Sequence, residues 1–198
     1  MDNLIKDMEQ YAQINNIPIM QKEGIAFLST LIKEHKIIRI LEIGTAIGYS
    51  AIRMAMIDSK IQVVSIERDT IRYQKAIVNI QKANMNNRIH VFHEDALTFD
   101  IDGEFDLIFI DAAKAQYIKF FEHYKKNLNK DGFILSDNLK FHGMVEQYNQ
   151  IKNRNTKQLV RKIQHYITYL KENKEYTTTF YDIGDGIAVS KKNEAFDL

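Results

Sequence analysis

Short apolar runs alternate along this chain with amphipathic helical patterns, and this alternation constrains the fold more than any other feature. The strand-like runs are residues 37–43, 62–66, 88–92, 105–110 and 132–136. Helical patterns lie at 50–57 and 69–85, and a third contains Tyr117, Phe120, Phe121 and Tyr124. Strands and helices that alternate with short connections predict a mostly parallel sheet covered by helices on both faces.

The two ends of the chain depart from this alternation. Residues 3–15 and 22–35 each place apolar side chains on one stripe, so we expect two amphipathic helices before the first strand. A long helix is predicted near 156–172, and two β-rich runs, TTTFYDI and GIAVS, follow it with only Gly184 and Asp185 between them. So short a connection requires an antiparallel pair of strands.

Few residues interrupt these patterns. The chain has one proline and eight glycines, and it contains no internal repeat and no Ser/Gly-rich linker. We therefore expect a single domain over residues 1–198, with N-terminal helices at 1–35 and an α/β core at 36–198.

Composition excludes several kinds of site and partner. The absence of cysteine rules out disulfides and thiolate metal sites and favours a reducing compartment. The 27 basic and 26 acidic residues nearly balance, so the whole chain has no charge that would attract nucleic acid or a membrane. The N-terminal stretch MDNLIKDMEQYAQ carries acids where a signal peptide is basic, and no run approaches about 18 apolar residues. These features predict a soluble cytoplasmic protein without a membrane partner.

Ligands of open α/β sheets bind beyond the carboxyl ends of the strands, near the point where the strand order reverses. The first strand runs into EIGTAIGYS, where Gly44 and Gly48 allow a tight turn and a close approach of the backbone to a ligand. This G-x-x-x-G spacing differs from the G-x-G-x-x-G fingerprint of dinucleotide sites. Glu67 ends the second strand, where a carboxylate can accept both hydroxyls of a ribose. A ribose without a pyrophosphate indicates S-adenosylmethionine, whose adenine would lie beside Asp95 and Ala96.

A second group of polar residues follows two later strands. Asp111 ends the strand FDLIFI, and Asp137 and Asn138 follow the strand GFILS. Two carboxylates and an amide oxygen are the hard ligands that suit Mg²⁺, which keeps positions open for water and substrate. Lys114 lies three residues after Asp111, and an ammonium beside a divalent cation loses its proton more easily, so Lys114 is a candidate general base.

Each motif also has a plainer interpretation. Glu42 and Glu67 could be ordinary surface acids at strand ends, and the glycines ordinary turn residues. Lys114 could be a solvated lysine at a helix start, and Asp137 a helix cap. The occurrence of both motifs in the expected order favours the functional interpretation.

Together, LEIGTAIGYSAIRMA, Glu67, FIDAAK, SDN and IGDGIAVSKK resemble the metal-dependent S-adenosylmethionine O-methyltransferases of the caffeoyl-CoA and catechol type. The resemblance covers about residues 17–192. It implies a Rossmann-like class I methyltransferase fold, in which a seven-stranded, mostly parallel sheet has an antiparallel last strand. Members of this family are often homodimers.

The resemblance also implies roles for individual residues. Asp111, Asp137 and Asn138 would bind Mg²⁺ or a similar cation, and Lys114 would be the catalytic base beside Asp111. The residues expected to hold the cofactor are Ile19, Met20, Glu42, Gly44, Gly48, Ser50, Glu67, Asp95, Ala96 and Asp111.

The acceptor is the harder question. Catechol enzymes of the family carry an aromatic wall after the metal-binding aspartate, where this chain has Ala112 and Ala113. The segments IPIM and DNLKFHG resemble those of bacterial methyltransferases that convert 5-hydroxyuridine to 5-methoxyuridine at the wobble position of transfer RNA. The O4 and O5 atoms of 5-hydroxyuridine form the same vicinal pair that a catechol offers a metal.

A local excess of basic residues favours the same substrate. Residues 139–162 contain six basic side chains and one acid, Glu146. The basic residues are Lys140, Lys152, Arg154, Lys157, Arg161 and Lys162. Such a stretch could bind the phosphates of an anticodon stem and loop, although a solvated helix face is the plainer interpretation. Two other hypotheses remain: an O-methyltransferase of a small catechol or other vicinal-hydroxyl metabolite, and a cofactor-binding module without catalysis.

Overall fold

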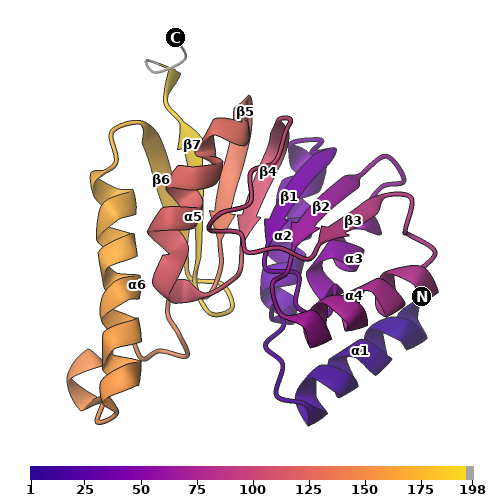
Figure 1. Cartoon of the computed structure of the whole chain (residues 1–198). Helices are drawn as coiled ribbons and strands as arrows, with labels where there is room; N and C mark the ends of the chain where they lie inside the picture. Colours follow the sequence, from indigo (N-terminus) through magenta and orange to yellow (C-terminus); the bar gives the residue numbers. More distant parts are fainter. Residues whose placement is uncertain (195–198) are drawn as a thin grey trace.

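The computed structural model describes residues 1–194 of the chain, and the strands in that range form one seven-stranded sheet (Figure 1). The strands are β1 (Arg39–Ile43), β2 (Gln62–Ile66), β3 (Ile89–Phe92), β4 (Phe105–Ile110), β5 (Leu128–Ser136), β6 (Tyr176–Tyr181) and β7 (Ile187–Lys192). The helices are α1 (Asp2–Ile14), α2 (Lys22–Glu34), α3 (Tyr49–Ala55), α4 (Thr70–Lys82), α5 (Tyr117–Tyr124) and α6 (Arg154–Glu172). Short 3₁₀ helices are η1 (Lys114–Gln116), η2 (Lys125–Asn127) and η3 (Tyr148–Gln150).

The strand order is β3-β2-β1-β4-β5-β7-β6. Strands β1 to β5 pair in parallel, whereas β7 runs antiparallel to both β5 and β6. The predicted Rossmann-like architecture is therefore confirmed, including the antiparallel last strand.

Several predicted boundaries were displaced by a few residues, and side-chain caps explain two of the displacements. Helix α6 begins at Arg154 and not at 156, because the Asn153 side chain caps it by accepting a hydrogen bond from the Thr156 amide at 3.0 Å. Helix α4 begins after Asp69, whose carboxylate accepts from the Arg72 amide at 2.9 Å.

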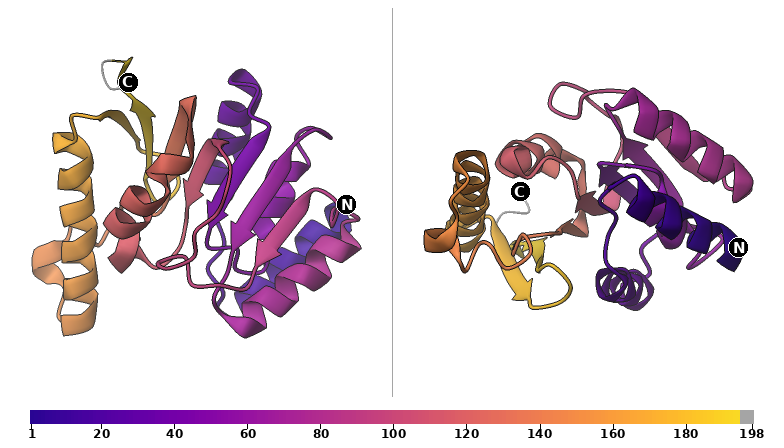
Figure 2. Two further views of the ribbon diagram at one scale, coloured as in Figure 1. Left: turned by 45° about the horizontal axis from the view of Figure 1, so that its top comes forward. Right: turned by 90° about the horizontal axis from the view of Figure 1, so that it is seen from below.

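Each face of the sheet packs against its own set of helices. The side chains of α1 to α4 form one hydrophobic core, and those of α5 and α6 form another. Successive residues of β1 alternate between them: Ile40 belongs to the first core and Leu41 to the second. Helix α1 lies alongside α4 (Figure 2), which adds the N-terminal segment to the first core. Among residues 1–194, no helix has both the length and the apolar character needed to cross a membrane.

Strands β1 and β4 are neighbours in the sheet. After β1 the chain continues to β2 and β3 on one side, and after β4 it continues to β5 on the other side, so the strand order reverses between β1 and β4. The residues that follow these two strands touch. A Cβ atom on Gly44 would lie 2.3 Å from the Asp111 carbonyl oxygen, and Gly44 has a φ of +100°, so this position requires glycine. This contact marks where the candidate site begins.

Candidate active site

A cavity of about 230 Å³ opens at the reversal point between β1 and β4. It is walled by the ends of β1, β2 and β4 and by residues of the segment that links α1 to α2. The lining residues predicted from the sequence are Ile19, Met20, Gly44, Ser50, Glu67, Asp95, Ala96, Asp111 and Lys114. The structure therefore brings most of the predicted cofactor residues to one cavity.

Glu67 is fixed at the end of β2 by two backbone amides. Its Oε2 atom accepts from the Ala46 amide at 2.8 Å, and its Oε1 atom accepts from the Asp69 amide at 2.9 Å. The side chain is only 7% exposed. These bonds join the glycine-containing turn after β1 to the start of α4 and hold the carboxylate against the cavity.

Glu42 and Gly48 do not line the cavity. Glu42 is fully buried behind it and accepts hydrogen bonds from the hydroxyls of Ser50 and Ser65. Burial raises the pKa of the Glu42 carboxyl to about 7, against the two hydroxyl donors that lower it. Gly48 directly precedes α3 with a φ of +83°, and a Cβ atom there would lie 3.4 Å from the Ala76 Cβ atom of α4. Both residues support the wall, with Glu42 orienting Ser50.

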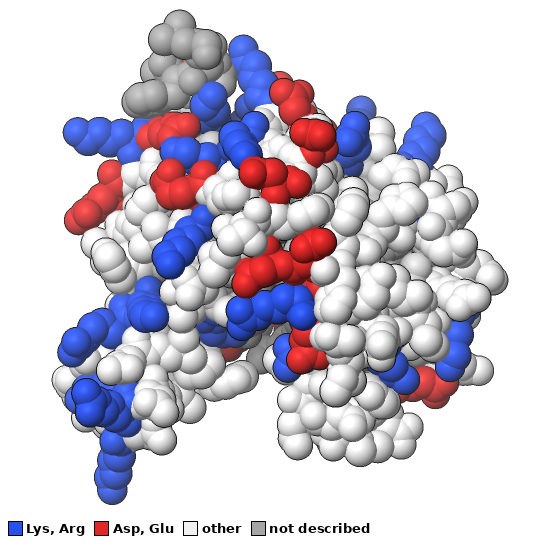
Figure 3. Space-filling model, viewed as in Figure 1, with Lys and Arg blue, Asp and Glu red and all other residues white. Residues whose placement is uncertain are grey.

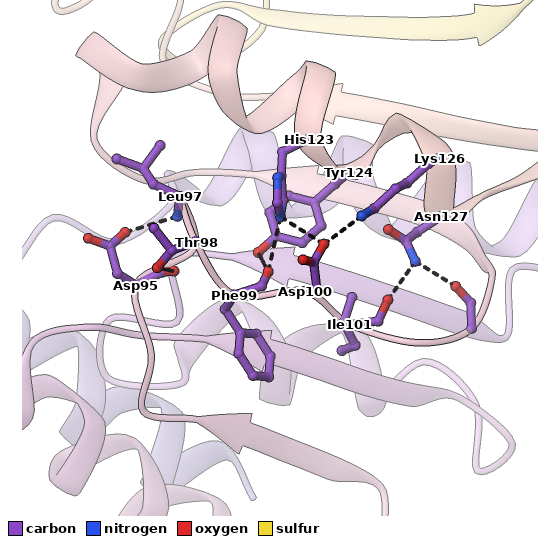
Figure 4. A network of polar contacts seen from close by, with 11 residues as sticks. Asp95, Leu97, Thr98, Phe99, Asp100, Ile101, His123, Tyr124, Lys126 and Asn127 are labelled. Carbon is purple, nitrogen blue, oxygen red and sulfur yellow. Dashed lines mark hydrogen bonds and ion pairs between the residues drawn. The ribbon is translucent and has the colours of Figure 1, made fainter.

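The segment after β3 forms the predicted adenine side of the cavity, and α5 anchors it (Figure 4). The Asp95 carboxylate accepts from the Leu97 amide at 2.9 Å, which closes a tight turn around Ala96. Farther along, the Phe99 carbonyl accepts from the Tyr124 hydroxyl at 2.9 Å. The Asn127 amide donates to the carbonyls of Ile101 and Gly103 (Figure 4).

Some lining residues were not predicted from the sequence. Tyr49 lies in the cavity wall and donates a hydrogen bond to Glu9 of α1 at 2.8 Å. Phe120 of α5 also lines the cavity, although its pattern in the sequence marked it only as a core residue. Tyr49 follows Gly48 directly in the glycine-containing turn, and that adjacency could have indicated it.

The candidate metal ligands meet beside this cavity. The Asn138 side-chain nitrogen lies 2.9 Å from Asp111 Oδ1 and 3.3 Å from Asp137 Oδ2, so one amide bridges two carboxylates. Asn138 adopts a left-handed φ of +64°, which directs its side chain between them. Asp111 lines the cavity, whereas Asp137 and Asn138 do not, and Asn138 contacts the cavity wall by its hydrogen bond to Asp111.

The electrostatics of this pair fit a bound cation. Burial raises the pKa of Asp137 to about 8, and the nearby Asp111 carboxylate adds to the increase. Burial also raises the pKa of Asp111, while Lys114 and the Asn138 amide oppose the change. Within residues 1–194, no three His, Cys, Asp or Glu side chains cluster as a metal site, so the candidate donor set is two carboxylates and one amide. The Asn138 amide here presents its nitrogen to both carboxylates, and a flip of the amide would present its oxygen instead. The three side chains would then form a set of hard oxygen donors with excess negative charge, which suits Mg²⁺.

Lys114 begins η1 and lines the cavity beside Asp111. Its Nζ atom lies 5.7 Å from the centre of the Phe141 ring, which belongs to the segment after β5. The ammonium group thus lies between the cavity and the segment that carries Asn138.

The predicted basic stretch divides into two parts. The Lys140 side chain pairs with Asp182 and lies 3.6 Å from Glu146, so its charge is largely neutralised. Counting charges along residues 139–162 could not reveal Asp182, which is distant in the sequence. The other predicted RNA-contacting residues, Lys152, Arg154, Lys157 and Arg161, lie on or next to the start of α6.

The fold and the cavity together define a Rossmann-like methyltransferase. The chain belongs to the O-methyltransferase family, whose model matches residues 1–193. It is accordingly an S-adenosylmethionine-dependent O-methyltransferase.

Individual relatives agree with this assignment. A caffeoyl-CoA O-methyltransferase from Populus kitakamiensis is 28% identical over 93% of this chain and 82% of its own length. A Staphylococcus aureus protein provisionally assigned as a caffeoyl-CoA O-methyltransferase has a structure with a TM-score of 0.92, at 38% identity over 96% of this chain and 92% of that chain. An O-methyltransferase from Bacillus cereus, solved with S-adenosylhomocysteine, has a TM-score of 0.81 at 26% identity, over 98% of this chain and 92% of that chain.

Proposed function

We propose that this protein is a Mg²⁺-dependent methyltransferase that converts 5-hydroxyuridine to 5-methoxyuridine at the wobble position of transfer RNA. One observation carries the proposal: Asp111 both lines the cofactor cavity and shares the Asn138 amide with Asp137. A cation held there would bring an acceptor oxygen next to the methyl donor. We expect a cytoplasmic homodimer.

One set of residues would bind the cofactor, and another would bind the cation and the acceptor. Glu67 would hold the ribose of the cofactor, Asp95 and Ala96 would flank its adenine, and the backbone at Ile19 and Met20 would close over it. When bound, S-adenosylmethionine supplies a methyl group on a sulfonium that a nucleophilic oxygen can attack.

The metal side would prepare that oxygen. Asp111, Asp137 and Asn138 would hold the cation. When bound, the cation draws electron density from the acceptor hydroxyl and makes its proton easier to remove. Neutral Lys114 would accept that proton on Nζ as the oxygen forms its bond to the methyl carbon, and the carbon–sulfur bond breaks. The cavity wall at Tyr49 and Phe120 would limit the access of water.

Two features support a nucleoside as acceptor. Ala112 and Ala113 line the cavity between Asp111 and Lys114 and leave more room than an aromatic wall would. The two vicinal oxygens of 5-hydroxyuridine would fill two of the three positions that a six-coordinate cation with three protein ligands keeps open.

The start of α6 supports an RNA partner. Arg154 and Lys157 occupy its first turn, where the helix dipole disfavours positive charge, so they do not stabilise the helix. The Tyr148 hydroxyl accepts from Arg161 at 3.0 Å, and Lys157 Nζ lies 4.9 Å from the Tyr148 ring centre, so two cations are held side by side. Lys and Arg side chains gather in this region, at the lower left of Figure 3. An external polyanion would be attracted there.

The second candidate is methylation of a small catechol or similar metabolite. It is favoured by the name of the Populus relative, a caffeoyl-CoA O-methyltransferase, which matches 93% of this chain. The third hypothesis, a module that binds cofactor without catalysis, disagrees with the membership of the chain in the O-methyltransferase family.

Replacing Lys152, Arg154 and Arg161 together by glutamine separates the first two candidates. We expect kcat/KM for 5-hydroxyuridine-containing transfer RNA to fall about tenfold or more, with a weaker salt dependence, because fewer phosphates are neutralised. Methylation of a free catechol should not change, since a small acceptor does not reach α6. Initial rates with labelled S-adenosylmethionine measure both.

The matched control replaces Lys33, Lys60 and Lys82 by glutamine. These lysines are exposed, and none belongs to the candidate site. Their replacement removes the same amount of positive charge as the α6 variant does. Equal losses in the two triple variants would show only a whole-chain charge effect. Unchanged activity of the α6 variant on transfer RNA would rule out this surface as the RNA contact.

A further inference from the structure

The β6–β7 turn packs against the segment that follows β5, here called the metal-side segment and defined as residues 138–143. The Leu139 amide donates to the Gly186 carbonyl at 3.0 Å, and the Lys140 amide donates to the Asp185 carbonyl at 2.7 Å. The His142 amide donates to Asp185 Oδ1 at 2.5 Å. Three backbone amides thus tie the segment to a turn that lies more than 40 residues later in the chain.

The metal-side segment needs such support because its backbone is unusual. Asn138, Phe141 and His142 have φ values of +64°, +48° and +56°, and none of them is glycine. Side chains with a Cβ atom adopt this left-handed conformation at a cost in free energy. The segment therefore relies on contacts outside itself to keep the backbone that directs Asn138 between Asp111 and Asp137.

Asp185 is the buried acidic side chain of this contact. It is 5% exposed, and its Oδ2 atom accepts no hydrogen bond from any described residue. The His142 Nδ1 atom lies 3.7 Å from this oxygen. A buried carboxylate oxygen without a hydrogen-bond donor lowers the stability of a fold. Its presence at this position therefore calls for an explanation.

The β6–β7 turn is itself closely packed on both sides. Gly186 has a φ of +85°, and a Cβ atom there would lie 3.1 Å from the Lys140 amide nitrogen, so the two backbones pack closely. On the other side, the position of a Cβ on Gly184 lies 3.7 Å from the Gly24 amide nitrogen at the start of α2. The turn is thus enclosed between α2 and the metal-side segment.

We propose that Asp185 is a positioning residue: by accepting the His142 amide, it holds the metal-side segment in the backbone that places Asn138 as a ligand. Asp185 thereby sets the affinity for the divalent cation without touching it. This inference rests on the proposed function, because the cation is part of that function. It adds a residue from β6–β7 to a site otherwise formed by the parallel strands.

Two substitutions distinguish the effect of the position of the Asp185 oxygen from the effect of the charge of Asp185. Asp185→Asn removes the charge but keeps an oxygen that can accept the His142 amide. Asp185→Glu keeps the charge but displaces the oxygen by one methylene. We expect Asn to bind Mn²⁺ within about threefold of wild type and Glu to bind about tenfold more weakly, the size of effect seen for groups that orient metal ligands.

The measurement is Mn²⁺ binding followed by electron paramagnetic resonance, with the full chain and without cofactor or acceptor. Thermal unfolding first establishes that each variant is folded at the temperature used. The control is Asp182→Asn in the same turn, because Asp182 is 83% exposed and contacts the Lys140 side chain but not the segment backbone. It should bind Mn²⁺ like wild type.

The opposite order, with Asn weak and Glu like wild type, would mean that Asp185 acts through its charge and would overturn the inference. Wild-type affinity in both variants would overturn it as well. A wild-type protein that binds no Mn²⁺ would instead contradict the metal part of the proposed function, and the inference with it, so the wild-type measurement distinguishes the two failures.

Discussion

Replacing Asp111 by alanine is expected to lower kcat/KM for methyl transfer by about a thousandfold or more, because charge stabilisation by a metal ion is worth several kcal/mol. The loss should apply to transfer RNA and to free catechols alike, since both would use the same cation. Initial rates at saturating Mg²⁺ and S-adenosylmethionine measure it.

Although its activity should fall, the Asp111→Ala variant should be at least as stable to unfolding as wild type. Because burial raises the pKa of Asp111 from the ordinary 3.8, the charged carboxylate is less stable in the folded than in the unfolded chain. This cost is absent at a pH below 3.8 and develops as the pH rises through the folded pKa. In EDTA at pH 8 the variant should therefore unfold at a temperature no lower than wild type.

The control for this experiment is Asp102→Ala, which removes an exposed acid from the loop before β4. It should leave the rate unchanged. If Asp111→Ala retained methyl transfer to a hydroxylated acceptor at a rate like that of the control, the metal-dependent mechanism would be wrong.

Replacing Lys114 by methionine is expected to lower kcat by about 10²- to 10⁴-fold, the contribution of a positioned general base. Methionine is one atom shorter than lysine and ends in a methyl group, so it keeps an unbranched apolar side chain and lacks the amine. Because Lys114 is not among the candidate metal ligands, Mn²⁺ binding should not weaken. Single-turnover rates and Mn²⁺ titrations together test this expectation.

Lys119→Met is the matched control, since Lys119 is an exposed lysine on α5. It should have wild-type rates. An unchanged kcat for Lys114→Met, or a loss fully explained by weaker Mn²⁺ binding, would exclude Lys114 as the base.

Much of the fold could be predicted because its central strands, such as β1 and β4, are buried on both faces and therefore appear as continuous apolar runs. The start of β5 could not, since three of the four residues in Leu128–Asp131 are polar and the segment contains no strand pattern. That part of β5 pairs with β4 across an irregularity in register, so it depends on tertiary contact. The left-handed backbone at Phe141 and His142 could not be predicted either, because it occurs at residues other than glycine.

The site was predicted at the level of motifs but less well at the level of single side chains. Glu42 lies one residue from the end of β1, on the face opposite to Leu41, so strand alternation directs it into the core beneath Ser50. Asp185 resembled an ordinary turn residue in the sequence. Its contact with His142 depends on how β7 pairs with β5, which no local pattern specifies.

The most direct test of the central claim is nucleoside mass spectrometry of transfer RNA from a strain that lacks this protein. We predict that 5-methoxyuridine disappears and 5-hydroxyuridine accumulates, and that wild-type protein, but not Asp111→Ala, restores the methylated nucleoside. An unchanged nucleoside profile would contradict the proposed transfer-RNA substrate and favour a small vicinal-hydroxyl acceptor.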